Sequence, residues 1–184
     1  DANLLGSALT AAGVAVAALR CRITAEDEFN ETVRATGSKA ETTTVPLAAL
    51  LNEAVAMHDG PIRIICDRQS GRLDYNGVLA HAFPDEPIAL DARTERASRY
   101  LLRDGRVAIH FETGSEERHL PAALASMTAK LVREFMMPRF NRHFGARRPG
   151  LRPTAGYVQD ARRWLGDTRD LLTEDERRQI VRIA

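Results

Sequence analysis

The stretch that decides the fold is residues 116–137, which read EERHLPAALASMTAKLVREFMM. Its large apolar residues recur at the spacing of one helical face, at Leu124, Met127, Leu131 and Phe135. Pro121 suits the first helical position, where its missing N–H is not needed. Alanines fill much of the first turns and keep them slim, so another backbone can approach closely. The pattern predicts a helix over 122–137 that is largely buried.

Polar residues form a second row along this predicted helix. Ser126, Lys130 and Arg133 follow one another at spacings that place them on one side. Glu116 and Glu117 lie just before the helix starts, where free N–H groups and the helix dipole favour negative charge. Two interpretations stay open: a solvated amphipathic helix with dipole-stabilising carboxylates, or a functional face.

The signature of a known family favours the functional face. Residues 125–137, ASMTAKLVREFMM, resemble the Ala-Ser-Ile-x-Ala-Lys-Val-x-Arg-Asp signature of ribonuclease HII. Downstream, Gly156-Tyr157 and the segment DARRWLG (160–166) resemble that family's Gly-Tyr segment and the helix after it. The resemblance implies a ribonuclease H fold that uses divalent metal ions to cleave the RNA strand of RNA–DNA hybrids.

The resemblance also implies a set of site residues. The family places one metal-binding carboxylate at the end of a central strand, which corresponds to Asp67, and another ten residues before the signature serine, which corresponds to Glu116, with Glu117 one position away. The family's opening motif, Asp-Glu-x-Gly-Arg-Gly, supplies two more carboxylates and does not occur in this chain. Tyr157 corresponds to a tyrosine that stacks on sugar at the cleavage junction, and it equally fits a surface tyrosine packed on its own helix.

The carboxylates suit this chemistry on general grounds. An acidic side chain at the carboxyl end of a central strand projects into the crevice where open α/β sheets bind ligands, and Asp67 follows the apolar run 62–66. The commoner role of such a residue is to start a turn. Mg²⁺ or Mn²⁺ held by Asp67, Glu116 and Glu117 would neutralise charge on a phosphodiester.

A basic region follows the signature. Nine Lys or Arg residues stand between positions 130 and 163, against two acids, in a chain whose formal net charge is only +1. We expect Ser126, Lys130, Arg133, Arg142 and Tyr157 to contact nucleic acid. The alternative is a solvated basic face, because all but two of the 26 basic residues are Arg.

Composition sets the class. The 184 residues, 44% hydrophobic and 28% charged, are typical of one globular domain. The apolar stretch 4–19 is interrupted by Gly and Thr, which argues against a membrane span or signal peptide. The two cysteines and five histidines show no zinc spacing. Since the chain begins without Met, we expect a trimmed or incomplete product. Separately, we expect the protein to be a monomer and to be cytoplasmic.

The coarse order of elements is mixed α/β. We expect helices at 4–12, 45–57, 73–83, 157–165 and 174–182, the last with a capping box at Thr173 and Glu176. We expect strands at 14–23, at 62–66 with burial on both faces, at 87–90, and in a hairpin of 95–102 with 107–112. Pro138 should kink or restart the long helix, and 144–155 should form a loop.

The sequence therefore predicts one ribonuclease H-like α/β domain, with a mixed sheet flanked by helices over 1–145 and a helical segment over 146–184 packed on it. The predicted function is a metal-dependent nuclease that acts on RNA–DNA hybrids. The competing hypotheses are a nucleic-acid-binding relative that has lost its metal ligands, and an α/β domain with an unrelated small-molecule role.

Overall fold

A four-stranded mixed sheet forms one side of the molecule in the computed structural model, which describes residues 2–69 and 71–183. The strands are β1 (Ile62–Asp67), β2 (Ala89–Arg93), β3 (Ala97–Leu102) and β4 (Val107–Glu112). Their order across the sheet is β1-β4-β3-β2, with β1 parallel to β4 and the other pairs antiparallel. The predicted class, α/β with a mixed sheet and flanking helices, is confirmed.

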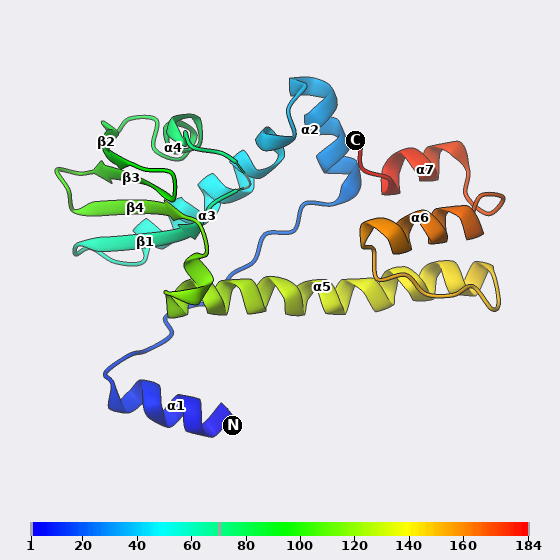
Figure 1. Cartoon of the computed structure of the whole chain (residues 1–184), viewed down its shortest axis with the longest axis horizontal. Helices are drawn as coiled ribbons and strands as arrows, with labels where there is room; N and C mark the ends of the chain where they lie inside the picture. The colour runs from blue at the N-terminus through cyan, green and yellow to red at the C-terminus, as the bar shows by residue number, and fades with distance from the viewer. Residues whose placement is uncertain (1, 70, 184) are drawn as a thin grey trace.

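The helices surround this sheet and continue beyond it (Figure 1). They are α1 (Ala2–Ala11), α2 (Glu26–Thr36), α3 (Thr44–Ala56), α4 (Asn76–Ala82), α5 (Leu120–Arg147), α6 (Val158–Asp167) and α7 (Glu174–Ile180), with short 3-10 turns η1 (Lys39–Thr43) and η2 (Ser115–Glu117). The long helix α5 runs from the sheet to α6, and α7 lies beside α2. Because α2 leads through η1 to α3, which packs on the sheet, a ring is formed by the sheet, α5, α6, α7, α2 and α3.

The main core lies between one face of the sheet and helices α3 and α4. Tyr75 and Phe111 are fully buried and stack in parallel, with ring centroids 3.6 Å apart, and Tyr100 meets Phe111 edge-on. The Tyr100 hydroxyl accepts the Tyr75 N–H, and the Tyr75 hydroxyl accepts the N–H of Gln69. These bonds give the buried phenols the polar partners that their burial requires.

A second, smaller core joins α5 to α6 and α7. Phe144, Trp164 and Leu172 are buried there, and Phe140 packs against them. The predicted boundary at residue 145, between the α/β core and the C-terminal helical segment, falls inside α5. This one helix therefore contacts both the sheet and the C-terminal helices.

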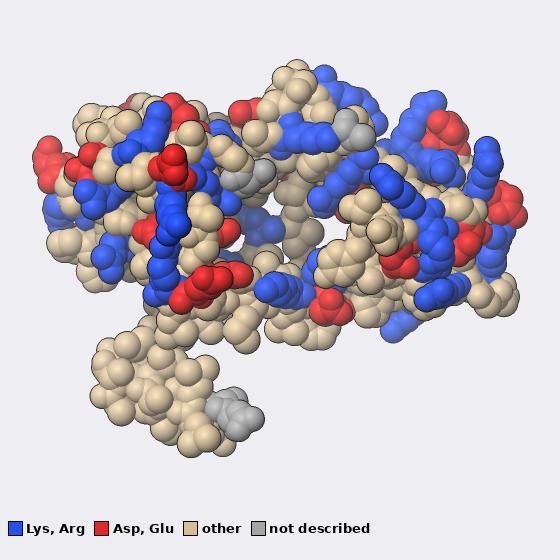
Figure 2. Space-filling model, viewed as in Figure 1, with Lys and Arg blue, Asp and Glu red and all other residues tan. Residues whose placement is uncertain are grey.

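Asn30 closes the ring between α2 and the C-terminal residues of the chain. It is fully buried on α2, donates to the carbonyls of Arg178 and Val181, and accepts the N–H of Ile183. A buried amide with three such bonds fixes α7 on α2. Figure 2 shows a hollow inside the ring, between the sheet and the α6–α7 helices, with Lys and Arg at its border.

Several local predictions are confirmed. The hairpin of β3 and β4 turns through Arg103, Asp104 and Gly105, all with positive φ. The expected helix at 45–57 is α3, and the capping box of Thr173 and Glu176 begins α7 with both of its hydrogen bonds. The helix at 73–83 is shorter than predicted, since α4 begins only at Asn76.

The predicted strand at 14–23 is wrong. This segment is extended and exposed, and it pairs with no strand of the described chain. Val14, Val16 and Leu19 are 46%, 50% and 60% exposed. Alternating apolar residues favour an extended backbone, but a strand also needs a partner to accept its hydrogen bonds, and this segment has none.

The expected burial of β1 on both faces is also wrong. β1 is an edge strand, and none of its residues is fully buried. Its inner residues Ile62, Ile64 and Cys66 pack against the main core, whereas Arg63 and Asp67 are exposed. The continuous apolar run thus reflects one covered face and a partly apolar cavity beside the edge, described below.

The long helix departs from prediction in two ways. α5 continues past Pro138 without a break, because contacts at both of its ends hold it in place. It is also mostly exposed: Met127, Leu131 and Phe135 are 64%, 55% and 67% exposed, and only Phe144 is buried. The apolar stripe that periodicity assigned to the core therefore has no covering element in the described chain.

A buried and an exposed phenylalanine predict different costs for the same substitution. Phe111→Ala should destabilise the protein by about 3–5 kcal/mol, because it removes a fully buried ring stacked on Tyr75. Phe135→Ala, at an exposed ring of the same size, should change the stability by less than about 0.5 kcal/mol. Urea unfolding followed by far-ultraviolet circular dichroism checks both, and equal costs would contradict the assignment of the core.

Candidate functional site

A cavity of about 410 Å³ lies between α3, the free edge of β1 and the first turns of α5. Its walls are mostly apolar side chains of α3 and β1 and the small Ala122 and Ala125 of α5. Four polar side chains reach it: Asp67, Gln69, Glu116 and Ser126. The slim first turns of α5 leave this space open. Three of the residues selected from the sequence, Asp67, Glu116 and Ser126, therefore share one site.

Asp67 is held by the turn that precedes α5. Its Oδ1 accepts the backbone N–H and the hydroxyl of Ser115, both at 3.1 Å, and Ser115 is fully buried. No hydrogen bond to Oδ2 is found in the described chain. Asp67 thus combines an anchoring oxygen with a second oxygen that is available to a ligand.

The two neighbouring glutamates differ in position. Glu116 lines the cavity, and Glu117 does not. Both belong to the single turn η2, so successive residues point in different directions around it. Of the two alternatives for the second carboxylate, the geometry favours Glu116.

Glu112 is a further carboxylate at this edge that the sequence analysis missed. It ends β4 as Asp67 ends β1, and the two are register partners in the parallel pair. Its carboxylate lies 3.2 Å from His119 Nε2 and 3.3 Å from His110 Nδ1, and it accepts from Arg118 at 3.0 Å. Burial alone raises the pKa of Glu112, but the hydrogen bonds from His119 and His110 outweigh it and lower the pKa.

Arg133 and Tyr157 meet further along α5. The Arg133 guanidinium carbon lies 4.3 Å from the centroid of the Tyr157 ring, and Arg133 also donates to the carbonyl of Ala155. The ring itself is 65% exposed. Ser126 and Arg133 are two helical turns apart, or about 10 Å along one side of α5. Ser126 and the Arg133–Tyr157 pair thus lie on the same side of the helix, whereas Arg142, another of the expected binding residues, lies on the opposite side of α5.

Gly156 permits this approach. It has a φ of 73°, and a Cβ there would lie 3.3 Å from Arg133 Nη2. Only glycine adopts this backbone readily and leaves the space free. The Gly-Tyr pair noted in the sequence therefore has a local structural reason.

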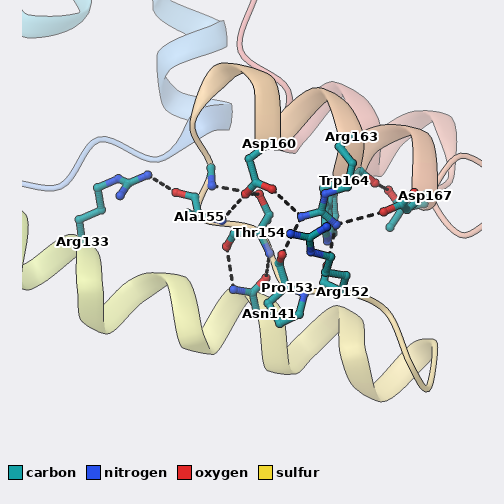
Figure 3. A network of polar contacts seen from close by, with 12 residues as sticks. Arg133, Asn141, Arg152, Pro153, Thr154, Ala155, Asp160, Arg163, Trp164 and Asp167 are labelled. Carbon is teal, nitrogen blue, oxygen red and sulfur yellow. Dashed lines mark hydrogen bonds and ion pairs between the residues drawn. The ribbon is translucent and has the colours of Figure 1, made fainter.

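A polar network fixes the loop that carries Tyr157 (Figure 3). Asn141 of α5 accepts the N–H of Thr154 and donates to its carbonyl. Asp160 of α6 accepts from Arg163, from the Ala155 N–H and from the Thr154 hydroxyl. Arg163, followed by these other donors, holds the pKa of Asp160 well below its usual value.

The basic region is less free than the sequence suggests. Arg147 pairs with Glu176, Arg148 with Asp170, and Arg163 with Asp160 and Asp167. Lys130 and Arg142 are exposed, and no ion pair to either is found among the described residues. The side chains available to phosphate are therefore a subset of those counted along the chain.

Within residues 2–69 and 71–183, no group of three or more His, Cys, Asp and Glu side chains is arranged to hold a metal ion. None of the helices described there combines the length and apolar character needed to cross a bilayer.

Comparisons of the chain with protein-family models, with curated proteins and with solved structures find no match. The assignment of function therefore depends on the geometry of the site and on the sequence motifs.

The Asp160 network makes the helical core sensitive to acid. Because its folded pKa is depressed, Asp160 contributes stability that is present above its unfolded pKa of about 3.9 and is lost as the pH falls below it. We expect Asp160→Asn to lower the urea midpoint of unfolding near pH 6. Between about pH 5 and pH 2 the midpoint should then decrease less in this variant than in the wild-type protein. Fluorescence of Trp164, the single tryptophan, reports on this core.

The matched control is Asp175→Asn, since the Asp175 side chain is 88% exposed and its contact with Arg178 is 3.8 Å long. This variant should follow the wild-type acid profile. An Asp160→Asn profile equal to wild type would contradict a stabilising role for the network.

Proposed function

We propose that this protein is a divalent-metal-dependent phosphodiesterase that hydrolyses the RNA strand of RNA–DNA hybrids. The observation that carries the proposal is the convergence of Asp67, Glu116 and Ser126 on one cavity, although they lie in three separate elements. Glu116 and Ser126 are close in sequence, so the informative part of this arrangement is that the tertiary fold brings the strand-end carboxylate Asp67 to them.

The carboxylates suit one hard cation. Asp67 Oδ2 and the Glu116 carboxylate are oxygen ligands of the kind that Mg²⁺ and Mn²⁺ prefer, and such ions complete their coordination with water and substrate phosphate. A bound ion would neutralise phosphate charge and lower the pKa of an attacking water. Ser115 fixes the other Asp67 oxygen, so the carboxylate is oriented before any ion arrives.

The substrate would follow the same side of α5. Ser126 lies at the cavity, and two turns away the Arg133 guanidinium could bind a phosphate while the exposed Tyr157 ring could stack on a sugar or base. Lys130 adds charge on this side; no described acid pairs with it or with Arg142, which lies on the opposite side of α5. A cytoplasmic location and a monomeric state belong to the same proposal.

Two other functions have an observation in their favour. Only two carboxylates reach the cavity, and no described group of three forms, which favours a nucleic-acid-binding relative without catalysis. The volume of about 410 Å³ and the mostly apolar walls also suit a small molecule. Metal-dependent cleavage separates the first proposal from both.

Catalysis should depend on Asp67 and Glu116. Asp67→Asn keeps an oxygen that can accept from Ser115 and removes only the charge, so the fold should survive. We expect this change and Glu116→Gln each to reduce Mg²⁺- or Mn²⁺-dependent cleavage of a hybrid duplex about a hundredfold, as for a loss of roughly 3 kcal/mol in the transition state. Glu117→Gln is the control and should remain near wild type.

Binding of hybrid duplex should depend on salt through the free cations. Lys130→Ala should reduce the slope of log affinity against log salt by about one, for one phosphate contact, and Arg142→Ala, on the opposite side of α5, should change it less. Arg169→Ala, at an exposed residue of the α6–α7 connection, should leave the slope unchanged. Slopes measured by fluorescence anisotropy that do not separate these variants would make the α5 surface a solvated face.

A further inference from the structure

The edge of β1 opposite β4 carries no described strand, although η2 and the first turns of α5 lie near its carboxyl end. Ile62 donates its N–H to Arg106, and Arg68 donates to Glu112, so the even-numbered residues bond to β4. In a parallel pair, alternate residues turn their N–H and C=O groups to opposite sides. Arg63, Ile65 and Asp67 therefore direct their backbone groups away from β4, where no described strand lies. A free edge of this kind readily takes another strand.

The space beside this edge is largely apolar. Leu47 and Leu50 of α3 and Ile65 of β1 line the cavity of about 410 Å³. A segment that enters it must therefore be able to lose water from its side chains at little cost, which excludes a charged one.

The N-terminal arm, defined as residues 2–19, has this character. It contains no Asp, Glu, Lys or Arg, and its last part reads VAVAAL (14–19). That part has an extended backbone, β-branched residues and exposed side chains, but it has no strand partner. The free edge of β1 and the segment 14–19 thus each lack a neighbouring strand in the described chain.

Ion pairs hold the end of this arm beside the cavity. Arg20 and Arg22 both pair with Glu53, which lies on α3 close to the end that leads into β1. From this anchor, residues 19 to 14 can run back along β1 from Ile62 to Asp67, antiparallel to it. Six residues on each side span about 20 Å at roughly 3.3 Å per residue, so the lengths match.

We propose that Val14–Leu19 adds to β1 of its own chain as an antiparallel fifth strand and covers the cavity. The order of the sheet becomes 14–19, β1, β4, β3, β2. The added strand satisfies the free N–H and C=O groups of β1 and buries Val16, and it removes an edge that would promote aggregation. Docking and release of the arm then control access to the cavity.

Amide hydrogen exchange of the full chain, resolved by residue, tests this directly. The amides of Arg63, Ile65 and Asp67 should exchange at least about tenfold more slowly than in Val16→Asp, whose arm carries a charge that opposes docking. The amides of Ile64 and Cys66, bonded to β4, should be protected in both proteins and serve as an internal reference. Ala8→Asp, at an exposed position of α1, should behave as wild type.

Each other outcome overturns the proposal. Unprotected odd-numbered amides in the wild-type chain would mean that the edge stays open. Protection that Val16→Asp does not alter would mean that another segment covers it. Protection that grows with protein concentration, together with a dimer in sedimentation, would mean that the arm docks on a second copy.

Discussion

The hydrogen bonds between Asp67 and Ser115 determine how the two halves of the molecule are joined. They tie the carboxyl end of β1 to the buried turn from which α5 starts, and so they fix where the long helix leaves the sheet. Beyond that point α5 carries the second core with α6 and α7, and α7 is held in addition by Asn30 of α2. The same carboxylate reaches the cavity, so a single residue both supports the fold and forms the candidate site.

Because the ring of elements is closed, α5 is fixed at its two ends and its middle part remains exposed. Asn30 fixes α7 to α2, and α2 leads back to α3 and the sheet, so α5 is held at both ends without being covered in the middle. Helical stability there comes from the anchored ends, which explains why Pro138 does not interrupt the helix. In this uncovered middle of α5, Lys130 is exposed and Arg133 partly exposed, so both are accessible to a partner.

The candidate site was predictable only where neighbours in sequence or a motif determine it. Asp67, Glu116 and Ser126 were selected as a strand-end acid, a motif carboxylate and a motif serine, and they do line one cavity. Glu112 was missed because its proximity to Asp67 depends on the parallel pairing of β1 with β4, which no local pattern encodes. Arg147 and Arg148 were counted as available cations because their acidic partners, Glu176 and Asp170, lie far along the chain.

Elements whose signals are local could be predicted from the amino-acid sequence alone. The β3–β4 hairpin, helix α3 and the capping box of α7 follow from turn residues, periodicity and capping chemistry within a few residues. Only the tertiary structure decided which apolar residues are covered. Residues 14–19 and the Met127–Phe135 stripe have the patterns of a buried strand and a buried helix, but remain exposed. The periodicity of the sequence shows which residues share an apolar face. Burial of that face also requires a second surface that packs on it, and only the whole fold determines whether such a surface is present.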